Sequence, residues 1–277
     1  MSADAPTPSP VRMAHRVDGD GPPLLLLAGT GYNGGTWPRD MVDRLAARFA
    51  VVTFDYRGTG DTPGTPGEYS TRLFAADVRA LIQELGRGPA HILGHSMGGR
   101  VAQWVAIDGP DLVRSLVLAS TGAGEFRPGS TQQTGIPPAA AEQMIERGYE
   151  GYMRFQIETT FFTADDHATR KDVVEELIRV FWAGRPSLHD YLKHVAARQG
   201  HRAVERLGEI HRPAYVLVGD ADTHAGGTGP HLDQARHLSN ALPGARLEVI
   251  GGSAHGYFWT QAETVLPRVA AFLEAAG

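Results

Sequence analysis

The sequence predicts an α/β fold in which a mostly parallel central sheet is flanked by helices. Short apolar runs bounded by Gly, Pro or Asp alternate along the chain with amphipathic segments of helical length. This alternation stops between about residues 122 and 207 and then resumes. The first observation predicts the sheet, and the second predicts a segment of different structure inserted into it.

Six strands are expected, because each apolar run is short and apolar on both faces, as in a parallel sheet covered on both sides. The expected strands are Leu24–Ala28, Val51–Asp55, His91–Gly94, Ser115–Ala119, Ala214–Val218 and Arg246–Ile250. The expected helices are Pro38–Arg48, Thr71–Leu85, Met97–Asp108, Leu232–Ala241 and Gln261–Ala275. Strands that alternate with helices in this way form a doubly wound sheet.

The segment 123–206 is predicted to be a helical cap on a core made of residues 1–122 and 207–277. It has no good strand pattern, but it has amphipathic stretches such as Lys171–Trp182 and Leu188–Arg198. It is also rich in aromatic residues. Most of these are expected to pack the cap onto the core.

The composition excludes several classes of function. The net charge is −5 and the basic residues are scattered, which is not the pattern of a nucleic-acid-binding protein. The absence of cysteine rules out disulfides, thiolate metal sites and cysteine nucleophiles, and it fits a cytoplasmic protein. No apolar run has the length of a signal peptide core or a membrane span. We therefore expect a cytoplasmic monomer or homodimer that acts on a small molecule, without nucleic-acid or membrane partners.

Residues 24–37, LLLLAGTGYNGGTW, contain the pattern G-x-G-x-x-G, and Asp55 follows about 20 residues later, as in dinucleotide-binding proteins. Glycine makes up 34 of 277 residues, so a random chain of this composition would contain the pattern about 0.5 times on average. In the dinucleotide motif the last glycine lies in the first helical turn. Here Pro38, a favoured first helical residue, starts the helix four residues after Gly34. The segment is interpreted as a loop, and no NAD or other cofactor is expected.

A second glycine-rich turn, Gly94-His95-Ser96-Met97-Gly98, has the pattern G-x-S-x-G between a predicted strand and a predicted helix. This turn strains the backbone at the serine, and small neighbours are needed to avoid clashes. Ser96 is therefore predicted to be a nucleophile. It stands at the start of a helix whose N–H groups favour developing negative charge.

A serine hydroxyl is a weak nucleophile, so a base and an orienting acid must accompany it. In this fold they are expected after later strands, in the chain order Ser, acid, His. GDAD follows the strand at 214–218, and GGSAHG follows the last strand. His255 is the predicted base, and the acid is Asp222 or Asp220.

Together these stretches resemble the α/β-hydrolase superfamily over the whole chain apart from the cap. GHSMGG matches the nucleophile elbow of the family, and GDAD and GGSAHG resemble its acid and histidine loops. FDYRGTGDT, at 54–62, resembles the family segment D-x-R-G-x-G-x-S, with Thr62 where serine is usual. The resemblance implies an α/β-hydrolase fold with a helical cap inserted after the sixth strand. It also favours Asp222 as the acid, with Asp220 as the alternative, and makes Asp55 part of the FDYRGTGDT loop.

The resemblance further implies that the loop LAGTGYNGG supplies half of an oxyanion hole. The backbone N–H groups of Met97 and Thr30 would be the two donors. The family often has histidine where this chain has Ala28, which leaves Gly31 as an alternative to Thr30.

The other candidate residues are assigned structural roles or a place in the pocket. His95 is expected to be a packed histidine. Asp220, Asp222 and His224 spell D-x-D-x-H, but this is interpreted as the acid loop, and no metal site is expected. His231 and His237 are expected to be solvated. The residues predicted to line the substrate pocket are Gly31, Tyr32, Tyr152, Phe155, Phe162, Trp182 and Tyr257.

The resemblance and the residues predict a serine hydrolase that forms an acyl-enzyme. The expected substrate is a carboxylic ester or lactone of medium size and largely apolar character. Because a fold does not determine its chemistry, several alternatives remain. The same fold allows C–C bond hydrolysis of the meta-cleavage type, amide hydrolysis and cofactor-free non-hydrolytic chemistry. A ligand-binding pseudo-hydrolase is the alternative from outside the enzymes.

Overall fold

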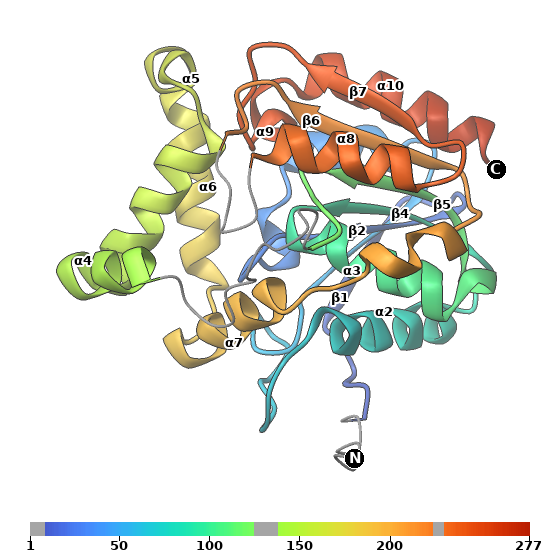
Figure 1. The fold of residues 1–277 in the computed structure, drawn as a ribbon, viewed down its shortest axis with the longest axis horizontal. Coiled ribbons are helices and arrows are strands. Elements are labelled where there is room, and N and C mark those ends of the chain that lie inside the picture. The colour runs from blue at the N-terminus through green and yellow to red at the C-terminus, as the bar shows by residue number, and fades with distance from the viewer. Residues whose placement is uncertain (1–8, 125–137, 224–229) are drawn as a thin grey trace.

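A seven-stranded sheet runs through the molecule, with helices on both faces and a further group of helices at one end (Figure 1). The computed structural model describes residues 9–124, 138–223 and 230–277. In chain order the strands are β1 (His15–Asp18), β2 (Pro23–Leu27), β3 (Ala50–Phe54), β4 (Ala90–His95), β5 (Val113–Ala119), β6 (Ala214–Gly219) and β7 (Arg246–Ile250). They lie in the order β1-β3-β2-β4-β5-β6-β7. Every neighbouring pair is parallel except β1 and β3, which confirms the mostly parallel sheet.

All six strands that the sequence predicts are present. β2, β3, β4 and β6 are buried along their whole length, as expected for strands covered by helices on both faces. The sequence does not predict β1. Its residues, HRVD, lie at the edge of the sheet and are mostly exposed, so they lack the two apolar faces by which the other strands are recognised.

Helices cover both faces of the sheet, as predicted. The core helices are α1 (Arg39–Ala46), α2 (Thr71–Leu85), α3 (Met97–Asp108), α8 (His231–Ala241), α9 (Tyr257–Thr260) and α10 (Ala262–Ala275). The shorter turns are η1 (Gly34–Thr36), η2 (Pro110–Leu112), η3 (Ile157–Phe161) and η4 (Val204–Glu209). α1 packs beside α10, and α2 packs beside α3. α2 and α3 have the predicted bounds, and the Ser70 side chain caps α2 by accepting from Leu73 N at 3.0 Å.

Four helices between β5 and β6 lie together at one end of the sheet (Figure 1). They are α4 (Pro138–Gln156), α5 (Ala164–Thr169), α6 (Lys171–Ala183) and α7 (Leu188–Gln199). They follow the fifth strand of the described chain, so the expected place after the sixth strand is wrong. Only one described strand, β1, precedes β2, so the strand before these helices is the fifth and not the sixth. Part of the predicted cap, residues 125–137, lies outside the described residues.

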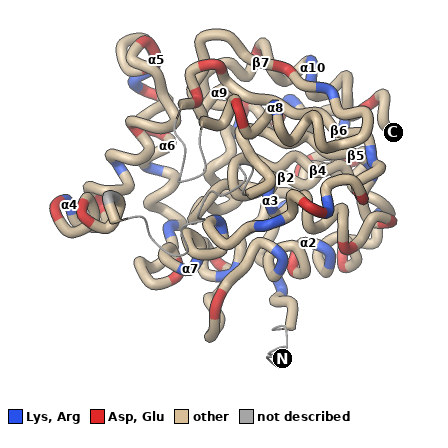
Figure 2. The backbone as a smooth tube through the Cα atoms, viewed as in Figure 1, with Lys and Arg blue, Asp and Glu red and all other residues tan. Residues whose placement is uncertain are grey.

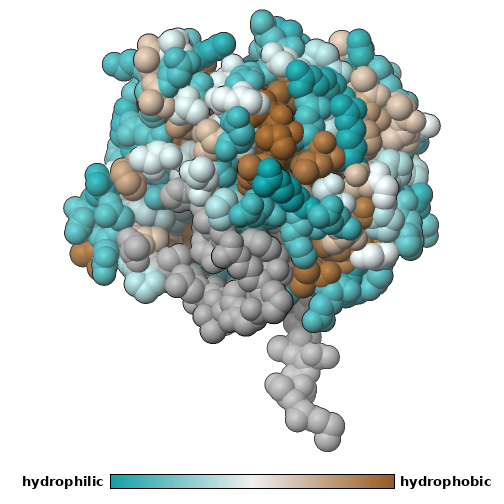
Figure 3. Space-filling view, turned by 45° about the horizontal axis from the view of Figure 1, so that its top comes forward, coloured by the Kyte–Doolittle hydropathy of each residue, from teal (hydrophilic) through white to brown (hydrophobic). Residues whose placement is uncertain are grey.

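The charges and the apolar surface are distributed without a dominant patch in the views drawn. Figure 2 shows acidic and basic residues interspersed along the tube. The face in Figure 3 is hydrophilic over most of its area, with hydrophobic atoms in a few limited groups. Among the described helices, none combines the length and the apolar character needed to cross a membrane.

A buried ion pair fixes the segment that follows β3. Arg57 donates from Nε and Nη2 to the two carboxylate oxygens of Asp77 on α2, at 2.8 and 2.6 Å, and both side chains are fully buried. Asp77 Oδ1 also accepts from the backbone N–H of Val11 at 3.0 Å. Buried charges are tolerated only when they are paired and hydrogen-bonded. This pair therefore holds the loop after β3 in one position against α2.

His194 on α7 joins the four helices α4–α7, which form the predicted cap, to the same segment. Its Nε2–H donates to the carbonyl oxygen of Arg57 at 2.9 Å, and the ring is buried against Phe74. Within the described residues, Nδ1 of His194 has no hydrogen-bond partner. Burial lowers the pKa of His194 to about 4, so the ring is neutral at pH 7 and carries its proton on Nε2.

The substitution Asp77→Asn is expected to destabilise the protein strongly, because it leaves the Arg57 charge buried without a counter-charge. The expected loss is about 3–5 kcal/mol of unfolding free energy, measured by urea denaturation. As a control, Asp40→Asn removes an exposed ion pair with Arg44 and should cost no more than about 1 kcal/mol. Equal losses for the two variants would contradict this account of the buried pair.

The buried ring of His194 is expected to make the fold sensitive to mild acid. Because the pKa of His194 is lowered to about 4, the unfolded chain binds more protons than the native state between pH 6.5 and 4. The unfolding free energy should therefore fall as the pH is lowered through this range, with His194 contributing at most about 3 kcal/mol.

The variant His194→Gln keeps a donor close to the position of Nε2 and does not titrate, so its stability should depend less steeply on pH. Thermal unfolding followed from pH 7 to pH 4 measures the slope. His211→Gln, a change at an exposed histidine, is the matched control. The same slope in the wild type and in His194→Gln would show that His194 is not the source.

Candidate active site

Ser96 occupies a strained turn between β4 and α3. Its backbone has φ 56° and ψ −118°, a conformation that costs free energy for any residue with a side chain. Two hydrogen bonds hold the strained residue: its N–H donates to the carbonyl of Ala119 at 2.9 Å, and its carbonyl accepts from Thr121 Oγ1 at 2.7 Å. The turn places Ser96 at the carboxyl edge of the sheet and at the start of α3.

Gly98, two residues after Ser96, can only be glycine because of a close backbone contact. A Cβ atom at this position would lie 2.0 Å from the carbonyl oxygen of Leu27. Only a residue without a side chain lets the first turn of α3 lie this close to the end of β2. The glycine is therefore required by the same close approach that presents Ser96.

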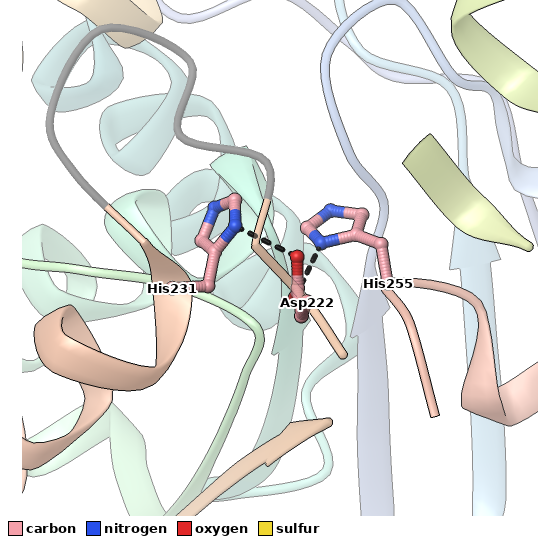
Figure 4. A group of neighbouring side chains, drawn as sticks. All are labelled: Asp222, His231 and His255. Atoms are coloured by element: carbon pink, nitrogen blue, oxygen red, sulfur yellow. Dashed lines mark hydrogen bonds and ion pairs between the residues drawn. The ribbon is translucent and has the colours of Figure 1, made fainter. Parts of the chain in front are cut away.

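His255 and Asp222 come together from the loops that follow β7 and β6 (Figure 4). His255 Nδ1 donates to Asp222 Oδ2 at 2.8 Å, and both side chains are buried. The alternative acid, Asp220, instead accepts from the backbone N–H of Ser253 at 3.3 Å. Of the two acids considered from the sequence, the structure brings Asp222 to the histidine and gives Asp220 a role in the turn.

His231 is a third member of this cluster, and the expectation that it is solvated is wrong. Its Nδ1 donates to Asp222 Oδ1 at 2.9 Å, and the ring is 4.8 Å from that of His255, centroid to centroid (Figure 4). The physical reason is that α8 begins at His231, whose backbone N–H donates to the carbonyl of Asp222 at 3.2 Å. The start of the helix is thus tied to the acid loop, and the ring is buried against it. His237, on the same helix, is half-buried.

The sequence does contain a signal that could have identified His231. It follows Pro230, and proline commonly stands at the start of a helix, so the first turn of α8 was predictable there. A first-turn residue that follows an acid loop lies at the same edge of the sheet as that loop. The helical spacing of His231 and His237 does not contain this information.

The two histidines determine the charge of Asp222. Burial by itself would raise the pKa of Asp222, but its electrostatic interactions with the His255 and His231 rings, and the hydrogen bonds from both, lower it well below its usual value. Burial lowers the pKa of His231, against the opposing effect of Asp222. At neutral pH the cluster is therefore a carboxylate with His231 as a neutral donor to one of its oxygens.

The same three side chains lie close enough together to hold a metal ion, because their ligand atoms lie within 4.8 Å of one another. Both Nδ1 atoms, however, are directed at separate oxygens of the carboxylate. Hydrogen bonds account for the spacing. His224, the last residue of the D-x-D-x-H pattern, lies outside the described residues.

His95 packs beneath the site, as predicted. Its Nε2 donates to the carbonyl of His255 at 2.9 Å, and its ring is 4.5 Å from the His255 ring, centroid to centroid. Burial, and then the proximity of the His255 ring, lower the pKa of His95 well below its ordinary value. His95 therefore supports the loop that carries His255 as a neutral ring.

Asp55 ties the first glycine loop to the segment after β3. Its Oδ1 accepts from Gly34 N, and its Oδ2 accepts from Asp61 N, each at 2.9 Å. The next α-helix begins at Arg39 and not at the glycines. The loop is thus held by a carboxylate of its own chain, which agrees with the interpretation of G-x-G-x-x-G as a loop.

A cavity of about 420 Å³ lies between the carboxyl edge of the sheet and the cap. Ser96, His255 and Thr30 line it, and so do three of the predicted pocket residues, Tyr32, Tyr152 and Phe155. The helices α4 and α7 and the turn η3 supply most of the remaining wall. Its volume is within the usual range for small-molecule sites. Met97 is fully buried at the start of α3.

Four residues predicted for the pocket do not line this cavity. Gly31 packs on Tyr191, and a Cβ at Gly31 would lie 2.7 Å from that ring. Phe162 is buried next to Phe161, which lines the cavity in its place.

The other two predicted residues are held elsewhere by their neighbours. Trp182 packs edge-on against Phe181 and Tyr149. The hydroxyl of Tyr257 donates to the carbonyl of Leu217 at 3.3 Å, below the end of β6. These corrections have one cause: the sequence shows that the residues are aromatic, but not which way a helix or loop is rotated.

A larger cavity of about 730 Å³ lies between α6 and the edge of the core near β1 and α1. It contains neither Ser96 nor His255. Trp37 and Trp259, whose rings stack at a centroid distance of 5.8 Å, line it on the side of the core. The chemistry-bearing residues belong to the smaller cavity.

A family model described as alpha/beta hydrolase fold matches residues 22–262. The chain belongs to this family. The solved enol-lactonase from Burkholderia xenovorans is similar to this α/β hydrolase with a TM-score of 0.79 and 24% identity, covering 95% of this chain and 96% of that one. At this identity the likeness shows the fold alone.

Two curated relatives differ widely in how much of their length matches this chain. This α/β hydrolase is 33% identical over 262 residues to Polyketide synthase ThaQ of Burkholderia thailandensis, which is 92% of this chain but 12% of that protein. It is 28% identical over 265 residues to Rhodomycin D methylesterase DnrP of Streptomyces peucetius, covering 84% of each. The chain thus spans about an eighth of the length of ThaQ but most of the length of DnrP.

Removing the second histidine of the cluster is expected to change how the hydrolase responds to pH. In His231→Leu, Asp222 Oδ1 loses its donor and is left buried. The carboxylate then holds its remaining ring proton more strongly. The rate of labelling by a fluorophosphonate, an electrophile for activated serines, should fall about tenfold. The acid limb of the pH profile of the labelling rate should move to higher pH.

The variant His231→Asn is the control, because its side-chain amide nitrogen lies near the position of the imidazole Nδ1. It should recover much of the rate and the original pH profile. An unchanged profile in His231→Leu would show that His231 only fills space.

Proposed function

We propose that this α/β hydrolase cleaves a carboxylic ester or lactone through a serine acyl-enzyme. The observation that carries the proposal is the shared cavity of Ser96 and His255, in which His255 is already bonded through Nδ1 to Asp222. A base held in this tautomer has its other ring nitrogen, Nε2, available to accept a proton. The similarity to a methylesterase over most of both chains supports an ester as substrate.

In the proposed reaction, Ser96 Oγ attacks the carbonyl carbon while His255 Nε2 accepts its proton. Asp222 holds the imidazole ring and stabilises the imidazolium that forms. The tetrahedral intermediate collapses when His255 returns the proton to the leaving oxygen, which departs as an alcohol. His255 then takes a proton from water, and the resulting attack releases the carboxylic acid and regenerates Ser96.

The negative oxygen of the intermediate is assigned to the backbone N–H groups of Met97 and Thr30. Met97 is the first residue of α3, and first-turn N–H groups have no acceptor within the helix. Thr30 lies in the wall of the cavity with Gly29. Each donor of this kind is worth about 10²–10³ in rate. The mechanism needs no cofactor.

Intact-mass analysis after treatment with a fluorophosphonate, followed by peptide mapping, tests this proposal. The wild type should gain one label, at Ser96. Ser96→Ala should gain none, and His255→Ala should react about 10³-fold or more slowly, because the serine has lost its base. Ser120→Ala is the matched control, since Ser120 lines the same cavity and also has a positive φ of 46°. It should be labelled like the wild type.

The other outcomes separate the alternatives. Folded wild-type protein that takes no label would remove the serine mechanism, and a ligand-binding or non-hydrolytic role would then lead. A label that persists in Ser96→Ala would place the reactive group elsewhere. If labelling is as proposed but esters and lactones are not turned over, C–C or amide bonds become the substrates to test.

A further inference from the structure

Two arginines lie in the wall of the cavity that contains Ser96, and the proposed reaction uses neither. Arg100 is on α3, four residues after Ser96, and Arg198 is in the last turn of the cap helix α7. Arg100 Nη1 donates to the carbonyl oxygen of Arg198 at 2.6 Å. The core and the cap therefore meet at this end of the cavity, and each contributes a positive charge.

Among the described residues, Arg198 has no partner for its charge. In the part of the chain that the structure describes, its guanidinium forms no ion pair or hydrogen bond, and its Nε is buried without an acceptor. Buried N–H groups nearly always have an acceptor, so one that faces a ligand cavity is a candidate for ligand binding. Glu142, the carboxylate among the lining residues, is exposed and forms no ion pair with Arg198 in the described chain.

The positive charge at this end acts on the groups around it. Burial, and then the charge of Arg198, lower the pKa of Arg100 to about 9. The charge of Arg198 also reaches the hydroxyls of Tyr152 and Tyr191, where it opposes the rise in pKa that burial causes. An anionic group entering the cavity would be attracted to this end and would relieve the unfavourable proximity of the two arginines.

We propose that the ester or lactone substrate carries a carboxylate, which Arg198 binds while Arg100 adds to the positive potential. This inference rests on the proposed function and specifies its substrate class. A guanidinium offers a planar pair of donors that matches a carboxylate, and one unpaired arginine matches one negative charge. Met153, Phe155 and Val195 make other parts of the wall apolar. The substrate class is therefore an acidic ester, such as a half-ester of a dicarboxylic acid or a lactone with a carboxylate side chain.

The test compares esters that differ only in charge. One pair places the charge on the acyl side: the p-nitrophenyl half-ester of glutaric acid and its neutral carboxamide analogue. The other pair places it on the alcohol side: 4-carboxyphenyl butyrate and 4-carbamoylphenyl butyrate. In one of the two pairs, kcat/KM of the wild type should be at least about tenfold higher for the carboxylate. Ratios near one in both pairs would overturn the proposal.

Variants locate the preference. Arg198→Gln should bring the ratio close to one, and Arg198→Lys should retain part of it, because lysine keeps the charge but loses the planar fork. Arg170→Gln removes the same charge from an exposed position of the cap and should leave the ratio unchanged. Thermal unfolding checks that each variant is folded. A ratio that stays high in folded Arg198→Gln would show that Arg198 does not bind the carboxylate.

Binding to the Ser96→Ala protein tests the arginines independently of turnover. Glutarate should bind this protein in calorimetric titrations, and addition of Arg198→Gln should weaken its affinity at least about tenfold. Glutarate binding that is unaffected by Arg198→Gln would overturn the proposal, and so would tighter binding of inorganic phosphate than of glutarate. If no ester is hydrolysed but glutarate binds through Arg198, the proposed reaction fails while the carboxylate site stands.

Discussion

The strained turn at Ser96 is the constraint on which the rest of the core depends. A non-glycine residue at φ 56° persists only if its surroundings hold it there, and here β5 supplies the acceptor for its N–H. The same turn requires α3 to start almost in contact with the end of β2, which only Gly98 permits. The position of α3 and the need for glycine at residue 98 therefore go together with this one backbone conformation.

Asp222 depends on a second constraint, the need to satisfy a buried carboxylate. Both of its oxygens accept a hydrogen bond from a histidine ring, one from His255 and one from His231. A buried carboxylate with one donor would be less stable and freer to rotate. His231 thus holds Asp222 from the side opposite His255, and it lies outside the local sequence motifs.

The features that could be predicted from the sequence are those determined by neighbouring residues. The buried strands show apolar residues on both faces, and five consecutive residues, 94–98, predict the turn at Ser96. The features that could not be predicted depend on contacts between distant segments or on helix rotation. β1 is recognisable only through its pairing with β3. His231 reaches Asp222 because of where α8 starts, and Trp182 misses the cavity because of how its helix packs.

The attachment of α7 to the core connects these constraints to the proposed substrate preference. His194 and Arg198 lie four residues apart on α7 and so project from neighbouring positions on one side of the helix. His194 is bonded to the carbonyl of Arg57, whose side chain is paired with Asp77 in the core. Arg198 can therefore hold a fixed place relative to Ser96 although the two residues belong to different parts of the fold. The helix that carries Arg198 is thus attached to the core by a hydrogen bond to the backbone of Arg57, whose side chain a buried ion pair fixes. Under our proposal, a change at Arg198 would therefore alter the substrate preference without moving Ser96 or His255.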